Sequence, residues 1–422
     1  MRTGATSNCG TLLLAVALGT VAACTGGSSD AATTVSVAPP TTAAAVDVDD
    51  GVLTIGLLIP LSGDGALLGR SVREGVALAI ADVNAAGGVQ GSPVRLAVRE
   101  EGQSNTETQS AIVKLEEAGV DAIIGPVSSV VALTSLDQIV GRDLVACSPT
   151  ASALALDDFP DLGLFFRTVA SDSLQAAAIA QEVERTGTTR AAVTYINDAY
   201  GRPFADALQA ELATRGIAVS LSTPFDPDGT STTDVAQAVA TDAADTVVVL
   251  AAASDGPAML AALTRVEGAR TPTYIVNGAQ QGEALSAVAG SMGGRLRGVR
   301  VVATGANPDF DKRMALNSPG TSGLYALNAY DCATLLALAA ESGARRSMLS
   351  SVAVAASTGG SNCASFAECA GVIRSGRNAD YEGPGGRLAL TADGTLANAV
   401  FEVFSYDETG RVEQLDRLST SY

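Results

Sequence analysis

The stretch VLTIGLLIPLSGDGALLG (residues 52–69) gives the main clue to the fold. Its first eight residues are almost all apolar, as expected of a parallel strand that is buried on both faces. The glycine-rich loop that follows raises the question of a phosphate site. Its glycines are spaced G-x-G-x-x-x-G, one residue too long for the dinucleotide fingerprint, and no Lys-Ser/Thr pair follows them. The acids that would contact a ribose, Glu100 and Glu101, also come too late, so nucleotide binding is weakly supported.

Short strand-like runs recur along the chain and alternate with helical patterns. The segment 71–84 places Val72, Val76, Ile80 and Val83 on one face of a helix. Runs typical of strands are VRLAVR (94–99), DAIIG (121–125), LVAC (144–147), AAVTYI (191–196), TVVVLA (246–251) and TYIV (273–276). This alternation predicts an α/β protein with two doubly wound parallel sheets, in which ligands bind beyond the carboxyl ends of the strands. The loops expected to border a ligand are 60–69, 125–129, 148–152, 197–201, 252–256 and 277–282.

The composition bounds the number of domains and the possible partners. A chain of 422 residues exceeds one core of ordinary size, which predicts two lobes. A net charge of −19 disfavours nucleic acid as a partner, and the absence of Trp disfavours a stacking surface. The chain has no His, which removes Ser-His-Asp and Cys-His catalysis and imidazole metal ligands. We therefore expect neither an enzyme nor a metal or cofactor site.

The amino terminus has the pattern of an export signal. Arg2 precedes the apolar stretch TLLLAVALGTVAAC (11–24), which is too short to cross a bilayer. Its end, VAAC, resembles the lipobox of bacterial lipoproteins, which predicts a signal peptide over 1–23 and a lipid on Cys24. The alternative is an ordinary signal in which Cys24 is incidental. The segment 24–50, rich in Ser, Thr, Ala and Pro, is predicted to be a disordered tether to the membrane.

The cysteines predict at least one disulfide. Signal removal deletes Cys9 and lipidation uses Cys24, which leaves an even number in the exported body. The four allow three pairings, and they are Cys147, Cys332, Cys363 and Cys369. The local pair in CASFAEC (363–369) is the easiest to close, whereas Cys147 and Cys332 are either bonded or buried as free thiols.

Several segments in succession resemble one family of binding proteins. They are IGLLIPLSG, REGVALAIADVNAAGGVQGSPVRL, AIIGPVSSVVAL, VACSPTASALAL, FFRTVASDSLQA, INDAYGRPFADAL, LYALNAYDCATLLALA and DYEGPGGRLALTADGT. Their order and spacing over about residues 52–410 are similar to type I periplasmic substrate-binding proteins. More narrowly, they resemble the branched-chain amino-acid and amide-binding proteins of ABC importers. The resemblance implies two doubly wound lobes joined by a three-strand hinge, with the ligand in the cleft between them.

The same resemblance implies where the chain passes from one lobe to the other. The crossings are expected near 168–171, 298–303 and 378–386. The first lobe would then comprise 51–168 with 303–378, and the second 169–302 with 379–422.

One end of the expected site suits a ligand carboxylate. Ser128 and Ser129 lie where a strand ends and a helix begins, so they cap the helix, bind an anion with its free N–H groups, or do both. By resemblance, Ser129 binds the ligand carboxylate, Thr150 and Ala151 offer main-chain contact, and Ser152 offers a hydroxyl. Turn formation after the neighbouring proline is the structural alternative for the last three.

The other end suits an ammonium group and an apolar side chain. Asp255 directly follows a strand, and an acid at this place in amino-acid-binding members pairs with the ligand ammonium; the alternative is a helix cap. Tyr200 matches an aromatic residue of the cleft, although packing alone would also explain it. Leu68 stands where the family commonly has an aromatic residue, and Asn277 and Gln280 are further cleft residues.

These features together predict a binding protein without catalysis. We expect a lipid-anchored, monomeric receptor of an ABC importer, located at the outer face of the cell membrane or in the periplasm. It would deliver a zwitterionic, apolar amino acid to a membrane permease. The alternatives are a receptor for an uncharged amide or urea-type ligand, and a ligand sensor on the same fold.

Overall fold

The computed structural model describes residues 50–422, except 64, 103, 243, 253–254, 281–282, 293, 303–306, 318, 320–322 and 408. The predicted signal peptide, Cys24 and nearly all of the predicted tether therefore lie outside the described residues. Within the described part of the chain, no helix is long and apolar enough to span a bilayer.

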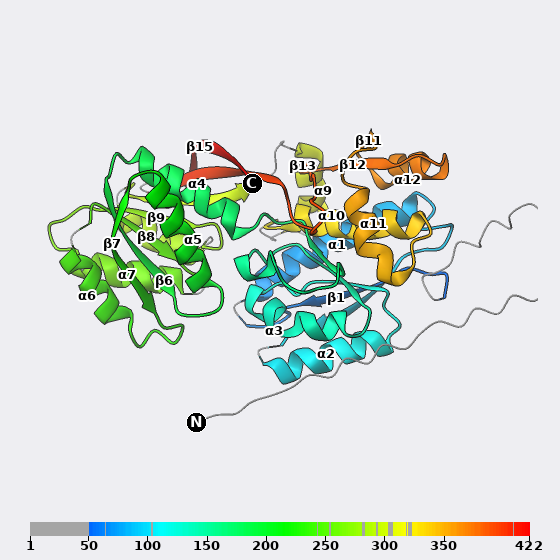
Figure 1. Ribbon diagram of the computed structural model, residues 1–422, viewed down its shortest axis with the longest axis horizontal. Coiled ribbons are helices and arrows are strands. Elements are labelled where there is room, and N and C mark those ends of the chain that lie inside the picture. Colours follow the sequence, from blue (N-terminus) through cyan, green and yellow to red (C-terminus); the bar gives the residue numbers. More distant parts are fainter. Residues whose placement is uncertain are drawn as a thin grey trace, which may run out of the picture. The chain divides into compact units, whose positions relative to one another are not determined.

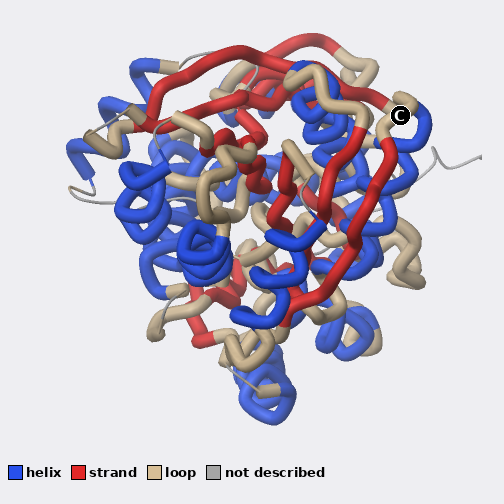
Figure 2. Tube along the Cα trace, turned by 90° about the vertical axis from the view of Figure 1, so that its left-hand side faces the viewer, coloured by secondary structure: helices blue, strands red, loops and turns tan. Residues whose placement is uncertain are grey.

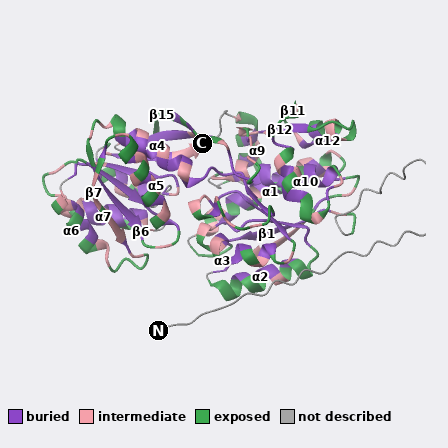
Figure 3. Ribbon diagram, in the orientation of Figure 1, coloured by how far each residue is buried: buried purple, intermediate pink, exposed green. Residues whose placement is uncertain are grey.

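The first sheet has five parallel strands in the order β2-β1-β3-β4-β5. They are β1 (Thr54–Ile59), β2 (Arg95–Glu100), β3 (Ala122–Ile124), β4 (Val145–Ser148) and β5 (Phe165–Arg167). Every residue of β1 is buried because helices cover both faces of the sheet, which explains its unbroken apolar run. Strand β2 lies at the edge, and its residues are exposed or half-buried, with charged residues at both ends. Figure 3 shows the buried strands in purple and the exposed outer faces of the helices in green.

Two groups of helices pack on the first sheet (Figure 1). One group is α1 (Ala66–Ala85), α10 (Ala326–Glu341) and α11 (Leu349–Ala355); the other is α2 (Asn105–Glu117) and α3 (Ser129–Val140). In α1, the predicted stripe of Val72, Val76 and Val83 is buried, and Ile80 is partly buried against it. Helix α10 is apolar around nearly its whole circumference because it packs against both α1 and the sheet. Short 3₁₀ turns occur at Leu154–Leu156 and Arg346–Met348.

The second sheet has seven strands in the order β15-β14-β10-β9-β8-β6-β7. They are β6 (Arg190–Ile196), β7 (Ala218–Phe225), β8 (Thr246–Leu250), β9 (Thr273–Asn277), β10 (Leu296–Val302), β14 (Asn398–Tyr406) and β15 (Val412–Ser421). The first five are parallel to one another, whereas β14 is antiparallel to both β10 and β15. These two form the long hairpin at the carboxyl terminus (Figure 2). The predicted α/β fold with two wound sheets is confirmed, with this antiparallel addition.

The helices of the second sheet again form two groups. Helices α4 (Asp172–Arg185) and α5 (Gly201–Thr214) contact each other, as do α6 (Thr232–Asp242) and α7 (Gly256–Val266). The short α8 (Glu283–Ala289) and a 3₁₀ turn at Gly290–Met292 precede β10.

A third, small sheet contains the end of the segment expected to belong to the first lobe. It has the order β11-β12-β13, formed by β11 (Ser361–Cys363), β12 (Ala379–Gly383) and β13 (Gly386–Arg387), and is flanked by α12 (Phe366–Arg374). Helix α9 (Pro308–Asn317) packs on α1. Because β12 pairs with β11, the chain stays in this region beyond residue 378. The third crossing is therefore better placed between β13 and β14, and the lobe boundaries stay a proposal.

The glycines of the opening loop have packing roles. A side chain at Gly69 would place its Cβ 1.8 Å from the carbonyl oxygen of Pro60, and at Gly75 it would lie 2.2 Å from that of Ala326. These residues let α1 approach the end of β1 and α10 closely. The N–H of Leu61 and the hydroxyl of Ser62 donate to the carboxylate of Glu100. A loop whose donors already serve a carboxylate does not fit a phosphate cradle.

Both pairs of body cysteines are bonded. Cys363 and Cys369 form the predicted local disulfide between β11 and α12. Cys147 of β4 is bonded to Cys332 of α10, which decides between the two alternatives for this pair. Both Cys147 and Cys332 are fully buried, so this disulfide ties the sheet to its covering helix inside the core.

Candidate ligand-binding site

The predicted site residues follow strands whose carboxyl ends meet at a common edge of each sheet. In the first sheet, β3 and β4 are parallel neighbours and lead into Ser128–Ser129 and Thr150–Ser152. In the second, β6, β8 and β9 are parallel and lead to Tyr200, Asp255 and Gln280. The fold therefore brings each group of predicted residues to one edge, as expected for doubly wound sheets.

The start of α3 is held in place by side chains from three directions. The hydroxyl of Ser128 caps the helix by accepting the N–H of Val131 at 3.4 Å. The hydroxyl of Ser129 accepts the N–H of Ala153 at 3.3 Å, which links this turn to the loop after β4. Glu101, only 4 % exposed, accepts the N–H of Val127 at 2.8 Å. The N-terminal end of α3 is thus a fixed, partly exposed set of backbone donors suited to an anion.

Burial shifts the titration of Glu101. It raises the pKa of this carboxyl to about 7, while the hydrogen bonds from the Val127 and Ser128 backbone act in the opposite direction. Glu101 therefore acts as a structural support for the loop.

The loop after β4 uses some of its polar groups internally. The hydroxyl of Thr150 donates to the carbonyl of Val127 at 2.7 Å, and Ala151 is fully buried. The backbone N–H groups of Thr150 and Ala151 donate to the hydroxyl of Ser148 at 3.4 and 3.0 Å, so the main-chain role expected of these residues stays a prediction. The hydroxyl of Ser152 donates to the carboxylate of Asp172 at 2.9 Å.

Asp172 is a candidate site residue that the sequence reasoning missed. It is the first residue of α4 and is 2 % exposed. Burial raises its pKa to about 7, and the nearby charge of Asp157 adds to this effect. The Ser152 hydroxyl, the positive charge of Arg167 and the Tyr200 hydroxyl lower the pKa in opposition. Asp172 is thus a buried acid next to two predicted ligand residues, which favours a functional role.

Three predicted residues that follow strands of the second sheet form a chain of hydrogen bonds. Asn277 donates to the hydroxyl of Tyr200 at 2.9 Å, and Gln280 donates to Asn277 Oδ1 at 2.7 Å and to the carbonyl of Val249 at 2.6 Å. All three are at least nine-tenths buried. Burial, followed by the charge of Asp172, raises the pKa of Tyr200 well above its usual value, so its hydroxyl stays protonated.

Tyr325 is a second residue that the sequence reasoning did not single out. It precedes α10 with a left-handed backbone (φ 57°). Its pKa is raised first by burial and then by the charge of Asp172, and it interacts electrostatically with Tyr200. An aromatic side chain from the helix over the first sheet therefore lies near the Asp172–Tyr200 group of the second.

Leu68 and Asp255 occupy the positions that the sequence indicates. Leu68 lies in the first turn of α1, partly buried against the apolar core. Asp255 is half-buried at the N-cap position of α7, after β8, and its side chain makes no cap hydrogen bond. The helix-cap alternative is thereby weakened, and its contact with a ligand stays a prediction.

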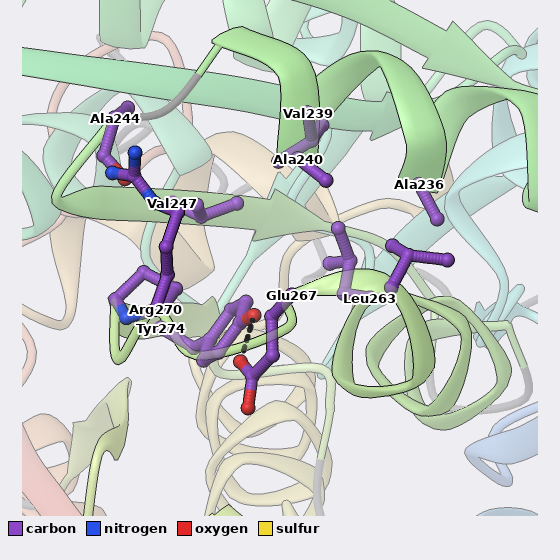
Figure 4. A pocket seen from close by; sticks show the side chains of 11 residues that line it. Ala236, Val239, Ala240, Ala244, Val247, Leu263, Glu267, Arg270 and Tyr274 are labelled. Atoms are coloured by element: carbon purple, nitrogen blue, oxygen red, sulfur yellow. Dashed lines mark hydrogen bonds between the residues drawn. The ribbon is translucent and has the colours of Figure 1, made fainter.

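A small hollow elsewhere in the second lobe does not fit the ligand site. It lies under Ala236, Val239 and Leu263, beside the pair formed by Tyr274 and Glu267 (Figure 4). Its volume of about 20 Å³ is room for roughly one water molecule. It borders the amino ends of β8 and β9, the edge opposite to the predicted ligand loops.

Comparisons with known proteins agree with the fold. The chain belongs to the periplasmic binding protein family, whose sequence model matches residues 52–411. It is 33 % identical over 183 residues to the Leu/Ile/Val-binding protein BraC3 of Rhizobium johnstonii, a match covering 42 % of this chain and 49 % of that protein. The chain spans about half the length of the curated relatives it matches.

Solved structures share the fold at low sequence identity. The branched-chain amino-acid transporter substrate-binding protein LivJ of Streptococcus pneumoniae, in complex with isoleucine, superposes with a TM-score of 0.71 at 18 % identity, covering 88 % of this chain and 100 % of that one. A solute-binding protein of an ABC transporter from R. palustris, in complex with benzoate, gives 0.71 at 16 % identity, covering 88 % and 98 %. These relatives and neighbours are substrate-binding proteins rather than enzymes, as expected for this chain. Family membership implies a location outside the cytoplasm.

Proposed function

We propose that this protein is the substrate-binding protein of an ABC importer and that it captures an apolar amino acid as a zwitterion. The observation that carries the proposal is the buried carboxylate of Asp172, which accepts the hydroxyl of Ser152 and lies close enough to Tyr200 for each to shift the pKa of the other. A buried carboxylate gains most from a cationic partner, and a ligand ammonium supplies one. We assign the ammonium to Asp172 and keep Asp255, the acid indicated by the sequence, as the competing candidate.

The ligand carboxylate is assigned to the start of α3 and the loop after β4. The backbone N–H groups at the start of α3 and the hydroxyl of Ser129 supply hydrogen-bond donors there, and the helix dipole favours an anion. Leu68, Tyr200 and Tyr325 offer apolar surface for the ligand side chain. The names of the relatives, which are Leu/Ile/Val-binding proteins, support a branched aliphatic side chain.

An uncharged ligand is the second candidate. Because burial raises the pKa of Asp172 to about 7, this residue can be protonated near neutral pH and donate a hydrogen bond to an amide oxygen. The benzoate complex on the same fold concerns a ligand without an ammonium group. A sensor role on the same fold would use the same site and differ only in the partner protein.

A thermal-shift screen of amino acids, amides and aromatic acids tests the proposed ligand class. A ligand present at 100 times its Kd stabilises the folded state by about 2.7 kcal/mol. Leucine, isoleucine and valine are expected to give the largest shifts. Stabilisation by amides alone would favour the second candidate.

The proposed setting is the outer side of the cell membrane, with a lipid on Cys24 and a flexible tether to a monomeric body. Closure of the two lobes on the ligand, through bending of the three crossings, would then present the loaded protein to the permease. One acyl chain gives only marginal binding and a second stabilises the anchor.

The lipid anchor predicts a clear change in fractionation. Cys24→Ser should move the protein from the membrane fraction to the soluble exported fraction, because the thiol that carries diacylglycerol is gone. Immunoblotting of fractionated cells measures this, with Cys9→Ser as the matched control that should leave the protein on membranes. A Cys24→Ser protein that stays with membranes would refute the lipid assignment.

A further inference from the structure

We propose that Arg167 is a positioning residue that sets both the shape and the charge of the ammonium site. The inference rests on the proposed function, since it concerns the site assigned to the ligand ammonium. Arg167 ends β5 and its side chain is completely buried. A buried guanidinium requires several hydrogen-bond acceptors. Those of Arg167 are two backbone carbonyls and the carboxylate of Asp157, and they belong to the segments that hold Asp172 in place.

The guanidinium holds the backbone on both sides of Ser152. Nη1 donates to the carbonyl of Ala151 at 3.4 Å and to that of Ala153 at 3.2 Å. Ser152, between them, donates its hydroxyl to Asp172. Arg167 thus fixes the turn that presents Ser152 to the carboxylate.

The same guanidinium also reaches the start of α4 through Asp157. Nη2 pairs with Asp157 Oδ1, and the Asp157 carboxylate accepts the hydroxyl of Ser171 at 2.8–2.9 Å and that of Ser173 at 3.4 Å. Ser171 and Ser173 flank Asp172 in the sequence. Arg167 and Asp157 therefore bracket both partners of the Ser152–Asp172 hydrogen bond.

The groups that shift the pKa of Asp172 come from three places. Asp157 and Ser152 lie in the loop after β4, Arg167 in β5 and Tyr200 at the N-cap of α5. Tyr325, before α10, is close enough for the charge of Asp172 to raise its own pKa. Arg167 is the one cation among the groups found to shift the pKa of Asp172. Burial and Asp157 favour the protonated acid, whereas Arg167, Ser152 and Tyr200 favour the carboxylate. Removing the charge of Arg167 must raise the pKa of Asp172, and removing that of Asp157 must lower it.

Leucine affinity is expected to fall as the pH is lowered. An ammonium group binds the carboxylate form, so the protein must lose a proton to bind at a pH below the pKa of Asp172. With this pKa at about 7, leucine affinity should fall about tenfold between pH 8 and pH 6. Arg167→Met should move the midpoint of this fall upward, and Asp157→Asn downward, each by on the order of one pH unit.

Carbon-13 NMR titration of the Asp172 carboxyl in the ligand-free protein measures the charge effect directly, and calorimetry with L-leucine at several pH values measures binding. Arg167→Lys is the matched variant, because it keeps the charge without the two-pronged geometry. Its leucine affinity should fall by the same factor at every pH, while the Asp172 midpoint stays near that of the wild type.

Asp157→Asn provides the test even if Arg167→Met does not fold. The proposal is supported if the Asp172 midpoint rises in Arg167→Met and falls in Asp157→Asn. An Asp172 midpoint that is unchanged in Asp157→Asn, and in Arg167→Met if that variant folds, overturns it. Shifted midpoints without leucine binding would instead refute the proposed ligand and leave the role of Arg167 intact.

Discussion

Asp172→Asn is expected to weaken leucine binding by about 2–5 kcal/mol, or roughly thirty- to several-thousand-fold in Kd. The substitution keeps the size of the side chain and an oxygen that accepts the Ser152 hydroxyl. It removes the charge that the ligand ammonium needs in a site where Asp172 is 2 % exposed. An ammonium left without its partner in such a site bears most of its desolvation cost. Calorimetry at pH 8, where the wild-type carboxylate is ionised, measures the loss.

Asp255→Asn is the matched control, because it makes the same change at the competing acid. Asp255 is half-buried, and its loss should cost under about 1 kcal/mol if it lies only at the rim of the site. A large loss for Asp255→Asn together with unchanged binding by Asp172→Asn would return the ammonium to Asp255. Unchanged binding in both variants would favour an uncharged ligand. Denaturation curves of the ligand-free variants separate binding from stability, since Asp172→Asn removes a buried acid and should not destabilise the fold.

Removal of the Cys147–Cys332 disulfide is expected to cost up to about 5 kcal/mol of unfolding free energy. The bond closes a loop with a sequence separation of 185 residues, and a long loop loses much chain entropy in the unfolded state. The other disulfide spans a separation of 6 residues, for which the same relation gives about 2 kcal/mol. The double variants Cys147→Ala/Cys332→Ala and Cys363→Ala/Cys369→Ala should therefore differ clearly in denaturant midpoint. Equal losses, or a larger loss for the local pair, would contradict this account.

The periodic parts of the fold could be predicted from the sequence because burial leaves a strong signature. Every strand-like run quoted above became a strand, since a strand covered on both faces requires continuous apolar residues. The hairpin of β14 and β15 was less visible because eight of the ten residues of β15 are exposed, so this strand carries no regular apolar pattern.

Some residues of the candidate site could likewise be predicted from the sequence, and others could not. Ser128, Ser129, Tyr200 and Gln280 could be found because they directly follow strands of a parallel sheet. Asp172 was missed because an acid after a Ser N-cap is the ordinary start of a helix, so its sequence context has a sufficient structural explanation. Its burial and its contact with Ser152 depend on how the loop after β4 meets α4, which no local pattern encodes. Tyr325 was missed for a similar reason, since it lies before α10 and not after a strand.

The central claim is that the site binds both charged ends of an apolar amino acid, and calorimetry with four matched ligands tests it most directly. L-leucine carries both charges, 4-methylpentanoate lacks the ammonium, 3-methylbutylamine lacks the carboxylate and 4-methylpentanamide lacks both. The account predicts that the wild-type protein at pH 8 binds leucine and that each analogue loses at least about tenfold in affinity, since a missing charge leaves its partner groups unpaired. Binding of 4-methylpentanamide or 4-methylpentanoate as tight as that of leucine would contradict the account.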